Sequence, residues 1–223
     1  MNDDSWGTYF PAISVLVFVA VSVAGFGVCE APKRSDSKRS NSELVFLLFI
    51  SILESVLVVL GLGMGWSLAA ILAFAVEVGF CFFELLYLSR SRDLPIPASV
   101  WVHHIATPIC VQCGLLRSDW RLLAKLSFAM ALSAGVLCVS KLVYRRRADG
   151  KGLLLQISFF VVVVFRLVVP GVILGSILVD LLTDPPPWAR LYATSALMLW
   201  VLNAQMAHSL YCLVSLGGRS KDY

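Results

Sequence analysis

Two adjacent histidines, His103 and His104, lie within an apolar run, Ala98 to Leu116, that is long enough to cross a bilayer. Ionisable side chains at membrane depth are costly and usually mark function. Imidazole gains and loses a proton near neutral pH, which suits it to acid–base catalysis. Thr107 lies one helical turn after His103, whereas His104 points about 100° away from it. The pair predicts either an acid–base site within the membrane or an interhelical hydrogen-bonded pair.

Further polar side chains interrupt the apolar stretches of the chain. Glu77 and Glu84 are seven residues apart and share one face of a helix. Each such residue is costly in hydrocarbon unless it faces the bundle interior or water. One interpretation is structural, with Glu–Arg or Glu–His pairs that hold helices together. Taken together, however, they predict a polar pocket enclosed by the later helices, and the residues in question are Glu54, Glu77, Glu84, Arg166, Asn203, Gln205 and His208.

Cys110 and Cys113 form a CxxC motif in the same run as the histidines. This spacing is typical of a redox pair in thioredoxin-like proteins. The sequence has no βαβ pattern, so two small residues at helical spacing are the favoured interpretation.

A zinc site built from His103, His104 and His208 is an alternative chemistry for the histidines. Because adjacent histidines on a helix diverge, we expect no metal site.

Composition identifies the class of protein that must position these residues. The 223 residues are 59% hydrophobic and 14% charged, with a mean hydropathy of +0.84, whereas soluble domains carry about 25% charged residues. The chain is therefore an integral membrane protein, and its net charge of +4 is assigned to loops that face anionic lipid rather than to a nucleic-acid surface. The six cysteines are expected to be buried thiols rather than a disulfide framework. The last apolar run contains no lysine for a retinal Schiff base, which argues strongly against the class of seven-helix retinal proteins.

Seven apolar stretches reach the length of about 20 residues that a membrane span requires. Because backbone polar groups must pair internally in lipid, each span is expected to be a helix, and the fold class is an all-α polytopic bundle. The first stretch follows an acidic segment and is expected to be a retained span rather than a signal peptide. Pro170–Gly171 predicts a kink or break in the sixth. The spans are Pro11–Cys29, Leu44–Gly63, Trp66–Leu88, Ala98–Leu116, Leu122–Tyr144, Leu153–Leu182 and Ala189–Leu216.

Basic residues alternate between the predicted loops. Lys and Arg concentrate in the first, third and fifth loops and in the C-terminal tail. Because basic loops remain in the cytosol, this pattern places the N-terminus outside or in a lumen and the C-terminus in the cytosol. We therefore divide the chain into an N-terminal anchor helix with a basic cytosolic linker (residues 1–43), a transmembrane domain (44–216) and a short cytosolic tail (217–223).

Several of these segments resemble the TLC-domain family, whose best-known members are the ceramide synthases. VHHIATPIC, at Val102–Cys110, resembles the HHxxT signature of that family. SRSRDL, at Ser89–Leu94, is similar to the basic-acidic stretch before the signature, although Asp93 lies further from the histidines, with two prolines inserted. Three downstream segments also resemble family motifs, namely Ser140–Arg145, Phe165–Ile173 and Gln205–His208. The resemblance covers roughly Glu43 to Leu216.

The resemblance implies a TLC-type bundle with a polar cavity that acts in lipid metabolism. The implied reaction is acyl transfer from a fatty acyl thioester to a lipid amine or hydroxyl, with acyl-CoA as co-substrate and no bound cofactor. His104 would act as base or acyl acceptor and His103 would relay the proton or bind the thioester carbonyl. Thr107 would orient an imidazole and Arg166 would hold an anionic group. The substrate-binding set is Thr107, Asp93, Glu84, Arg166, Asn203, Gln205 and His208.

One departure from the family pattern favours a different function. Ceramide synthases carry an acidic cluster at positions that correspond to Ala131, Ala134 and Cys138, which are apolar here. The chain looks more like the smaller TLC-domain proteins, so a non-catalytic protein that binds or senses lipid is the alternative hypothesis. A metal-dependent lipid amidase is a third. The expected partners are membrane lipids and a homo- or hetero-oligomer, without nucleic acid, and the resemblance implies the endoplasmic reticulum.

Overall fold

The chain folds into helices only, throughout the residues that the computed structural model describes, which are 6–29, 40–91, 97–117, 120–146, 151–180 and 187–215. Seven of its helical segments are long and apolar enough to cross a membrane. The predicted all-α class and the seven predicted spans are therefore confirmed. The elements are α1 (Trp6–Val28), α2 (Asn41–Met64), α3 (Ser67–Ser91), α4 (Ala98–Leu116), α5 (Trp120–Arg146), α6 (Lys151–Val162), η2 (Val163–Val168), α7 (Val169–Asp180) and α8 (Pro187–Ser215).

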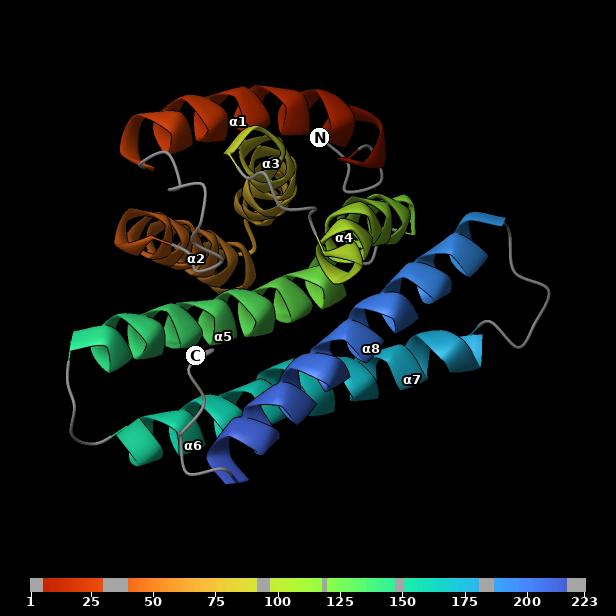
Figure 1. The fold of residues 1–223 in the computed structure, drawn as a ribbon. Helices are drawn as coiled ribbons and strands as arrows, with labels where there is room; N and C mark the ends of the chain where they lie inside the picture. The colour runs from red at the N-terminus through yellow and green to blue at the C-terminus, as the bar shows by residue number, and fades with distance from the viewer. Residues whose placement is uncertain are drawn as a thin grey trace.

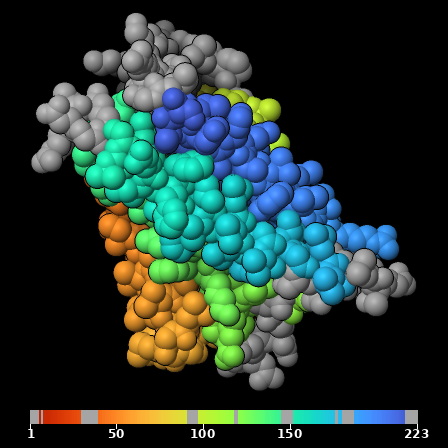
Figure 2. Space-filling model, turned by 90° about the horizontal axis from the view of Figure 1, so that it is seen from below, coloured from red at the N-terminus to blue at the C-terminus, as the bar shows by residue number. Residues whose placement is uncertain are grey.

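The helices form two groups with α5 between them (Figure 1). In the first group α1 packs along α3, and α2 contacts both α3 and α5. In the second group α8 packs against α4, α6 and α7. Figure 2 shows α6, α7 and α8 covering one face of the molecule, with α5 beside them. Because α3 lies among α1, α2, α4 and α5, its polar residues are the ones most enclosed by the bundle.

The surface of the bundle is rich in large apolar side chains. Examples from α1, α2 and α7 are Leu16, Phe49 and Val172, which are 72%, 58% and 71% exposed. In water such a surface would drive association, whereas lipid solvates it without cost. The exposed apolar surface thus agrees with the membrane location that hydropathy predicts.

The sixth span is irregular where the sequence predicts a kink. Residues Val163–Val168 form a π-helical segment, and α7 resumes at Val169, just before Pro170. Proline supplies no backbone N–H, so it leaves a carbonyl of the preceding turn without its usual partner. The Trp200 indole on α8 donates to the Leu167 carbonyl at 3.0 Å. The span therefore continues through the proline with a widened turn, which is typical of functional helices.

Two glycines allow α3 to approach its neighbours closely. A Cβ at Gly79 would lie 3.1 Å from the backbone of Phe18 on α1, and a Cβ at Gly61 on α2 would lie 2.9 Å from Ala70. Small residues at helix crossings are typical of membrane bundles, because packing drives helix association in lipid. These contacts fix α3 at the centre of its group.

Candidate functional site

Four side chains from α3 and α4 form a buried group that we call the histidine cluster, comprising Cys81, Glu84, His103 and His104. Nε2 of His104 lies 3.2 Å from Oε2 of Glu84. One ring nitrogen from each histidine and the Cys81 sulfur all lie within 4.8 Å of one another. His104, Glu84 and Cys81 are 4%, 7% and 3% exposed, while His103 is half-buried. The cluster is thus a carboxylate–imidazole pair with a thiol and a second imidazole beside it.

The two helices explain why these residues meet. Cys81 and Glu84 are three residues apart and share one face of α3, and α3 packs against α4. The rings of His103 and His104 have centroids 5.2 Å apart at an interplanar angle of 65°. Although their Cβ atoms diverge by about 100° on an ideal helix, the side chains converge on the side of α3. Both histidines therefore belong to one site.

The His104 ring is oriented by Glu84. Because Nε2 faces the carboxylate, it carries the proton in this pairing, and the remaining nitrogen, Nδ1, holds the lone pair. Nδ1 is buried and has no hydrogen-bond partner among the described residues. An imidazole held by a carboxylate with its other nitrogen available is the arrangement of a general base.

A second polar group, which we call the carboxylate–arginine network, lies at the centre of the bundle. The Ser127 hydroxyl on α5 contacts Oε1 of Glu54 on α2 and lies 3.3 Å from Oε2 of Glu77 on α3. Both carboxylates interact electrostatically with Arg166. Opposite charges within the membrane favour each other strongly because each is costly alone. This network therefore joins three helices and the π-helical segment.

Arg166 donates to three acceptors within the bundle. Its Nε donates to Ser133 Oγ at 2.7 Å, and its two terminal nitrogens donate to Asn203 Oδ1 at 3.4 Å and the Met130 carbonyl at 3.5 Å. The last two contacts are long and weak. The side chain is only 8% exposed, and these contacts join the π-helical segment to α5 and α8.

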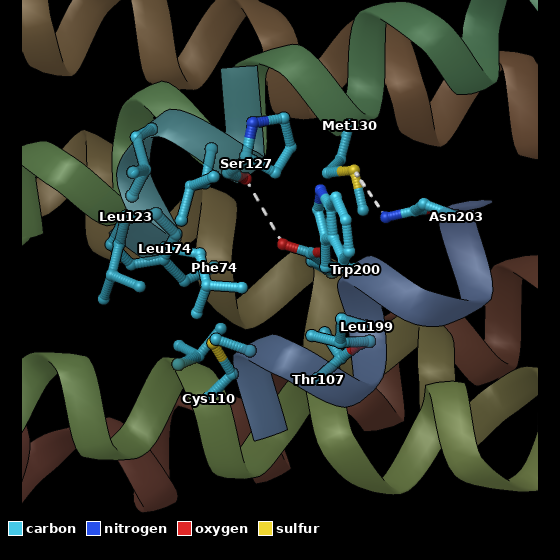
Figure 3. Close-up of a pocket in the computed structure, with 16 residues that line it drawn as sticks. Phe74, Thr107, Cys110, Leu123, Ser127, Met130, Leu174, Leu199, Trp200 and Asn203 are labelled. Carbon is cyan, nitrogen blue, oxygen red and sulfur yellow. Dashed lines mark hydrogen bonds between the residues drawn. The ribbon is translucent and has the colours of Figure 1, made fainter. Parts of the chain in front are cut away.

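A cavity of about 70 Å³ lies between α3, α4, α5, α7 and α8. In Figure 3, Ser127, Met130 and Asn203 lie along one side of it, and Thr107 and Cys110 lie along the opposite side. Most of the remaining lining is apolar. A site of this kind suits a ligand with an apolar body and a polar end. Thr107 links the cavity to the histidine cluster, since it is one helical turn from His103.

A second, smaller cavity of about 20 Å³ shares Glu84 with the histidine cluster. Glu84 lines it together with Glu43 and Cys29 and with aromatic and aliphatic residues of α2 and α3. Glu43 lies in the first turn of α2, where it belongs to a capping box with Ser40. Glu84 therefore faces both His104 and the helix ends on the side of the first and third loops.

The structure brings together some of the predicted site residues and separates others. Glu84 joins the histidines, and Asn203 joins Arg166. The Thr107 hydroxyl donates to the His103 backbone carbonyl at 2.9 Å. The His104 imidazole is instead oriented by Glu84. The expected pocket does not include the exposed residues Gln205 and His208.

Two other predicted site residues, His208 and Asp93, are not part of the histidine cluster that the structure describes. His208 pairs with Cys212 at 3.7 Å on the exposed face of α8, so it does not complete a three-histidine site. Asp93 lies outside the described residues.

Sequence reasoning missed Cys81 and Ser127 as site residues. A signal existed for Cys81, because it lies between Glu77 and Glu84 at spacings that place all three on one helical face. No comparable signal marked Ser127, since serines in helices usually bond to their own backbone. Its position depends on how α5 packs against α2.

No protein-family model, no curated protein and no solved structure matches this chain. The site must therefore be interpreted from its own chemistry.

Proposed function

We propose that this chain is a membrane enzyme that transfers an acyl group from a fatty acyl thioester to a lipid amine or hydroxyl. The observation that carries the proposal is the buried His104–Glu84 pair, whose distance is 3.2 Å, one turn from a largely apolar cavity. A buried imidazole with an unpartnered nitrogen is costly to keep for packing alone. The resemblance to the TLC-domain family supports the same substrate class.

The residues supply each part of the reaction. Nδ1 of His104 accepts the proton of the attacking amine or hydroxyl as the new acyl bond forms and the thioester sulfur leaves. Glu84 stabilises the positive imidazolium that results, since it already faces Nε2. His103, whose ring lies beside His104, contacts the thioester carbonyl. General acid–base catalysis contributes about 10²–10⁴ in rate.

The two cavities provide places for the substrates. The larger cavity, of about 70 Å³, is smaller than the roughly 150 Å³ that holds a benzene molecule. It takes only the part of an acyl chain nearest the carbonyl, and the rest of the chain lies in lipid. The polar end of the substrate approaches Glu84 from the side of the first and third loops, which basic residues predict to be cytosolic.

The family pattern implies acidic residues on α5, where this chain has none. Its carboxylates near the histidines lie on other helices instead. Ala131 and Cys138 are buried and apolar. Glu84 on α3 and Glu54 on α2 are buried, and Glu77 on α3 is half-buried. This arrangement gives the histidines a carboxylate partner without the α5 cluster.

The proposal is tested by lipid profiles of cells that lack the protein. Cells rescued with wild type should regain a specific lipid class, whereas His103→Ala/His104→Ala at matched protein level should not. His208→Ala is the matched control, because His208 lies on the exposed face of α8 and should rescue fully. Restoration of the lipid class by the double variant would show that the histidines are not catalytic.

A second function, non-catalytic lipid binding, is favoured by one specific observation. Arg166 already donates to Ser133, Asn203 and Met130, so the bundle core is built for rigidity rather than for anion exchange. In that case the cavity binds lipid and the histidine cluster is structural. Lipid binding by purified protein without any turnover would support this second function.

A further inference from the structure

We propose that the histidine cluster is a zinc site with Cys81, His103 and His104 as ligands and with an open fourth position. The inference deepens the proposed function, on which it rests only for the identity of the substrate. With zinc bound, His103 and His104 are ligands and the ion takes over the contact with the acyl carbonyl, so that His104 is the base only in zinc-free protein. It stands on the placement of three ligand atoms from two helices within 4.8 Å of one another. Among the described residues, this is the group of three His, Cys, Asp or Glu side chains whose ligand atoms lie close enough to hold one metal ion.

The spacing of the ligand atoms fits zinc. Zn–S bonds of about 2.3 Å and Zn–N bonds of about 2.0–2.1 Å place tetrahedral ligand atoms roughly 3.3–3.7 Å apart. The observed limit of 4.8 Å closes to these values by small rotations of the side chains. The two imidazole rings already turn toward the same side of α4, with centroids 5.2 Å apart.

The donor types select zinc over the common hard cations. One thiolate and two imidazoles are the donors that zinc prefers, whereas calcium and magnesium take oxygen ligands. Three protein ligands with a free fourth position are typical of catalytic zinc, and closed four-ligand sets are typical of structural zinc. The cluster therefore belongs to the catalytic type.

Glu84 does not bind the ion but orients one of its ligands, His104. It faces Nε2 of His104 at 3.2 Å, which leaves Nδ1, the nitrogen without a partner, as the ligand atom. Carboxylate–histidine–zinc arrangements of this kind fix the ring and raise its basicity. The charges also cancel, because the Cys81 thiolate and the Glu84 carboxylate balance a divalent ion. A neutral site is the form that a membrane interior tolerates.

The ion also explains why Cys81 lies in the cluster. Acid–base chemistry at His104 needs no thiol, and Cys81 is only 3% exposed, so contact with bulk solvent does not account for its place beside the histidines. Zinc would polarise, as a Lewis acid, an acyl carbonyl that binds at its open position. The small cavity that Glu84 lines is the entry path for the ion from the side of the first and third loops.

The test is metal analysis of the purified full chain, carried on a tag without histidines and prepared without chelators. Wild type should hold about one zinc per chain. Cys81→Ser, which keeps the size of the side chain, should lose the ion. His104→Ala should lose it as well. Two controls should keep it: Cys110→Ser removes another buried thiol, and His208→Ala removes the exposed histidine that pairs with Cys212.

Cobalt provides a second readout that does not depend on activity. Wild type loaded with Co²⁺ should show the thiolate-to-metal charge-transfer band of a cobalt–cysteine bond, and Cys81→Ser should not. All variants are compared only when they elute as the same monodisperse species as wild type.

The two proposals fail separately. Wild type that holds no zinc, even after incubation with Zn²⁺, or Cys81→Ser that keeps it, would overturn the metal site. If such zinc-free protein still transfers acyl groups, the proposed function stands with His104 as the base. If zinc is bound but no acyl group is transferred, the metal site stands and the reaction must be reassigned.

Discussion

Replacing Glu84 by Gln tests the pairing on which the proposed chemistry depends. The change keeps the size of the side chain but removes the negative charge that faces Nε2 of His104 at 3.2 Å. Both residues are more than nine-tenths buried, so solvent screens the interaction little. Hydrogen bonds to charged groups contribute about 1.5–3 kcal/mol, and neutral ones contribute about 0.5–1.5 kcal/mol. The substitution should therefore cost about 1.4 kcal/mol in the transition state, which corresponds to about tenfold in rate.

The assay is the initial rate of acyl transfer from labelled acyl-CoA in vesicles that contain the purified protein. The turnover number kcat should fall about tenfold while KM stays near its original value, because the carboxylate acts on the imidazolium that forms in the transition state. Glu43→Gln is the matched control, since Glu43 lines the same small cavity but bonds to the Ser40 backbone. A fall of less than about twofold for Glu84→Gln, or an equal fall for Glu43→Gln, would refute the reasoning.

Three further predictions concern the scaffold and its orientation. Arg166→Met removes three hydrogen bonds and leaves buried carboxylates uncompensated, so the free energy of unfolding in detergent should fall by about 3–5 kcal/mol; an unchanged value would show that the network is not structural. Gly79→Ala places a Cβ 3.1 Å from the Phe18 backbone and should destabilise the bundle by about 1–3 kcal/mol. Gly27→Ala, with nothing within 4 Å, should leave thermal unfolding unchanged, and equal effects of the two alanines would contradict the close α1–α3 packing. A C-terminal tag should be accessible to protease only from the cytosolic side, and protection from a cytosolic protease would reverse the proposed orientation.

The seven spans could be predicted from the sequence because lipid imposes a simple rule, although several of their ends differ by a few residues from the predicted bounds. Each span needs a long apolar run, and each backbone group in it must bond within its helix. The Ala98–Leu116 span is a helix with those same bounds. The irregularity at Pro170 also followed from local chemistry, because proline removes a backbone donor. Its form did not, since the π-helical segment, Val163–Val168, lies before the proline and no local pattern marks it.

The candidate site could be predicted only in part. The sequence singled out His103, His104 and Glu84 because ionisable groups stand out against an apolar background. It could not show that both imidazoles turn toward α3, because that depends on the tilt between two helices and on side-chain rotation. The spacing of Cys81 from Glu77 and Glu84 placed it on their helical face, but only the packing of α3 on α4 places it beside the histidines. Gln205 and His208 stood out as polar side chains in an apolar run, yet they lie on the exposed face of α8.

The carboxylate–arginine network likewise could not be predicted in full, because it depends on how several helices pack. Glu54, Glu77 and Arg166 lie on segments far apart in the chain, and their charges suggested pairing. The serine that links the two carboxylates is uncharged and gave no signal. Long-range packing of α2, α3 and α5 decides which charges meet, and a single sequence does not contain that information in a local pattern.

The measurement that tests the central claim most directly is a turnover assay on purified wild type and His104→Gln in lipid vesicles, with isotopically labelled acyl-CoA and mass spectrometry of the lipids. Wild type should place the labelled acyl chain in a new lipid amide or ester. His104→Gln, at equal thermal stability, should be slower by about 10²–10⁴. Equal product from the two proteins would contradict a catalytic histidine, and no labelled lipid from wild type would contradict the enzyme itself.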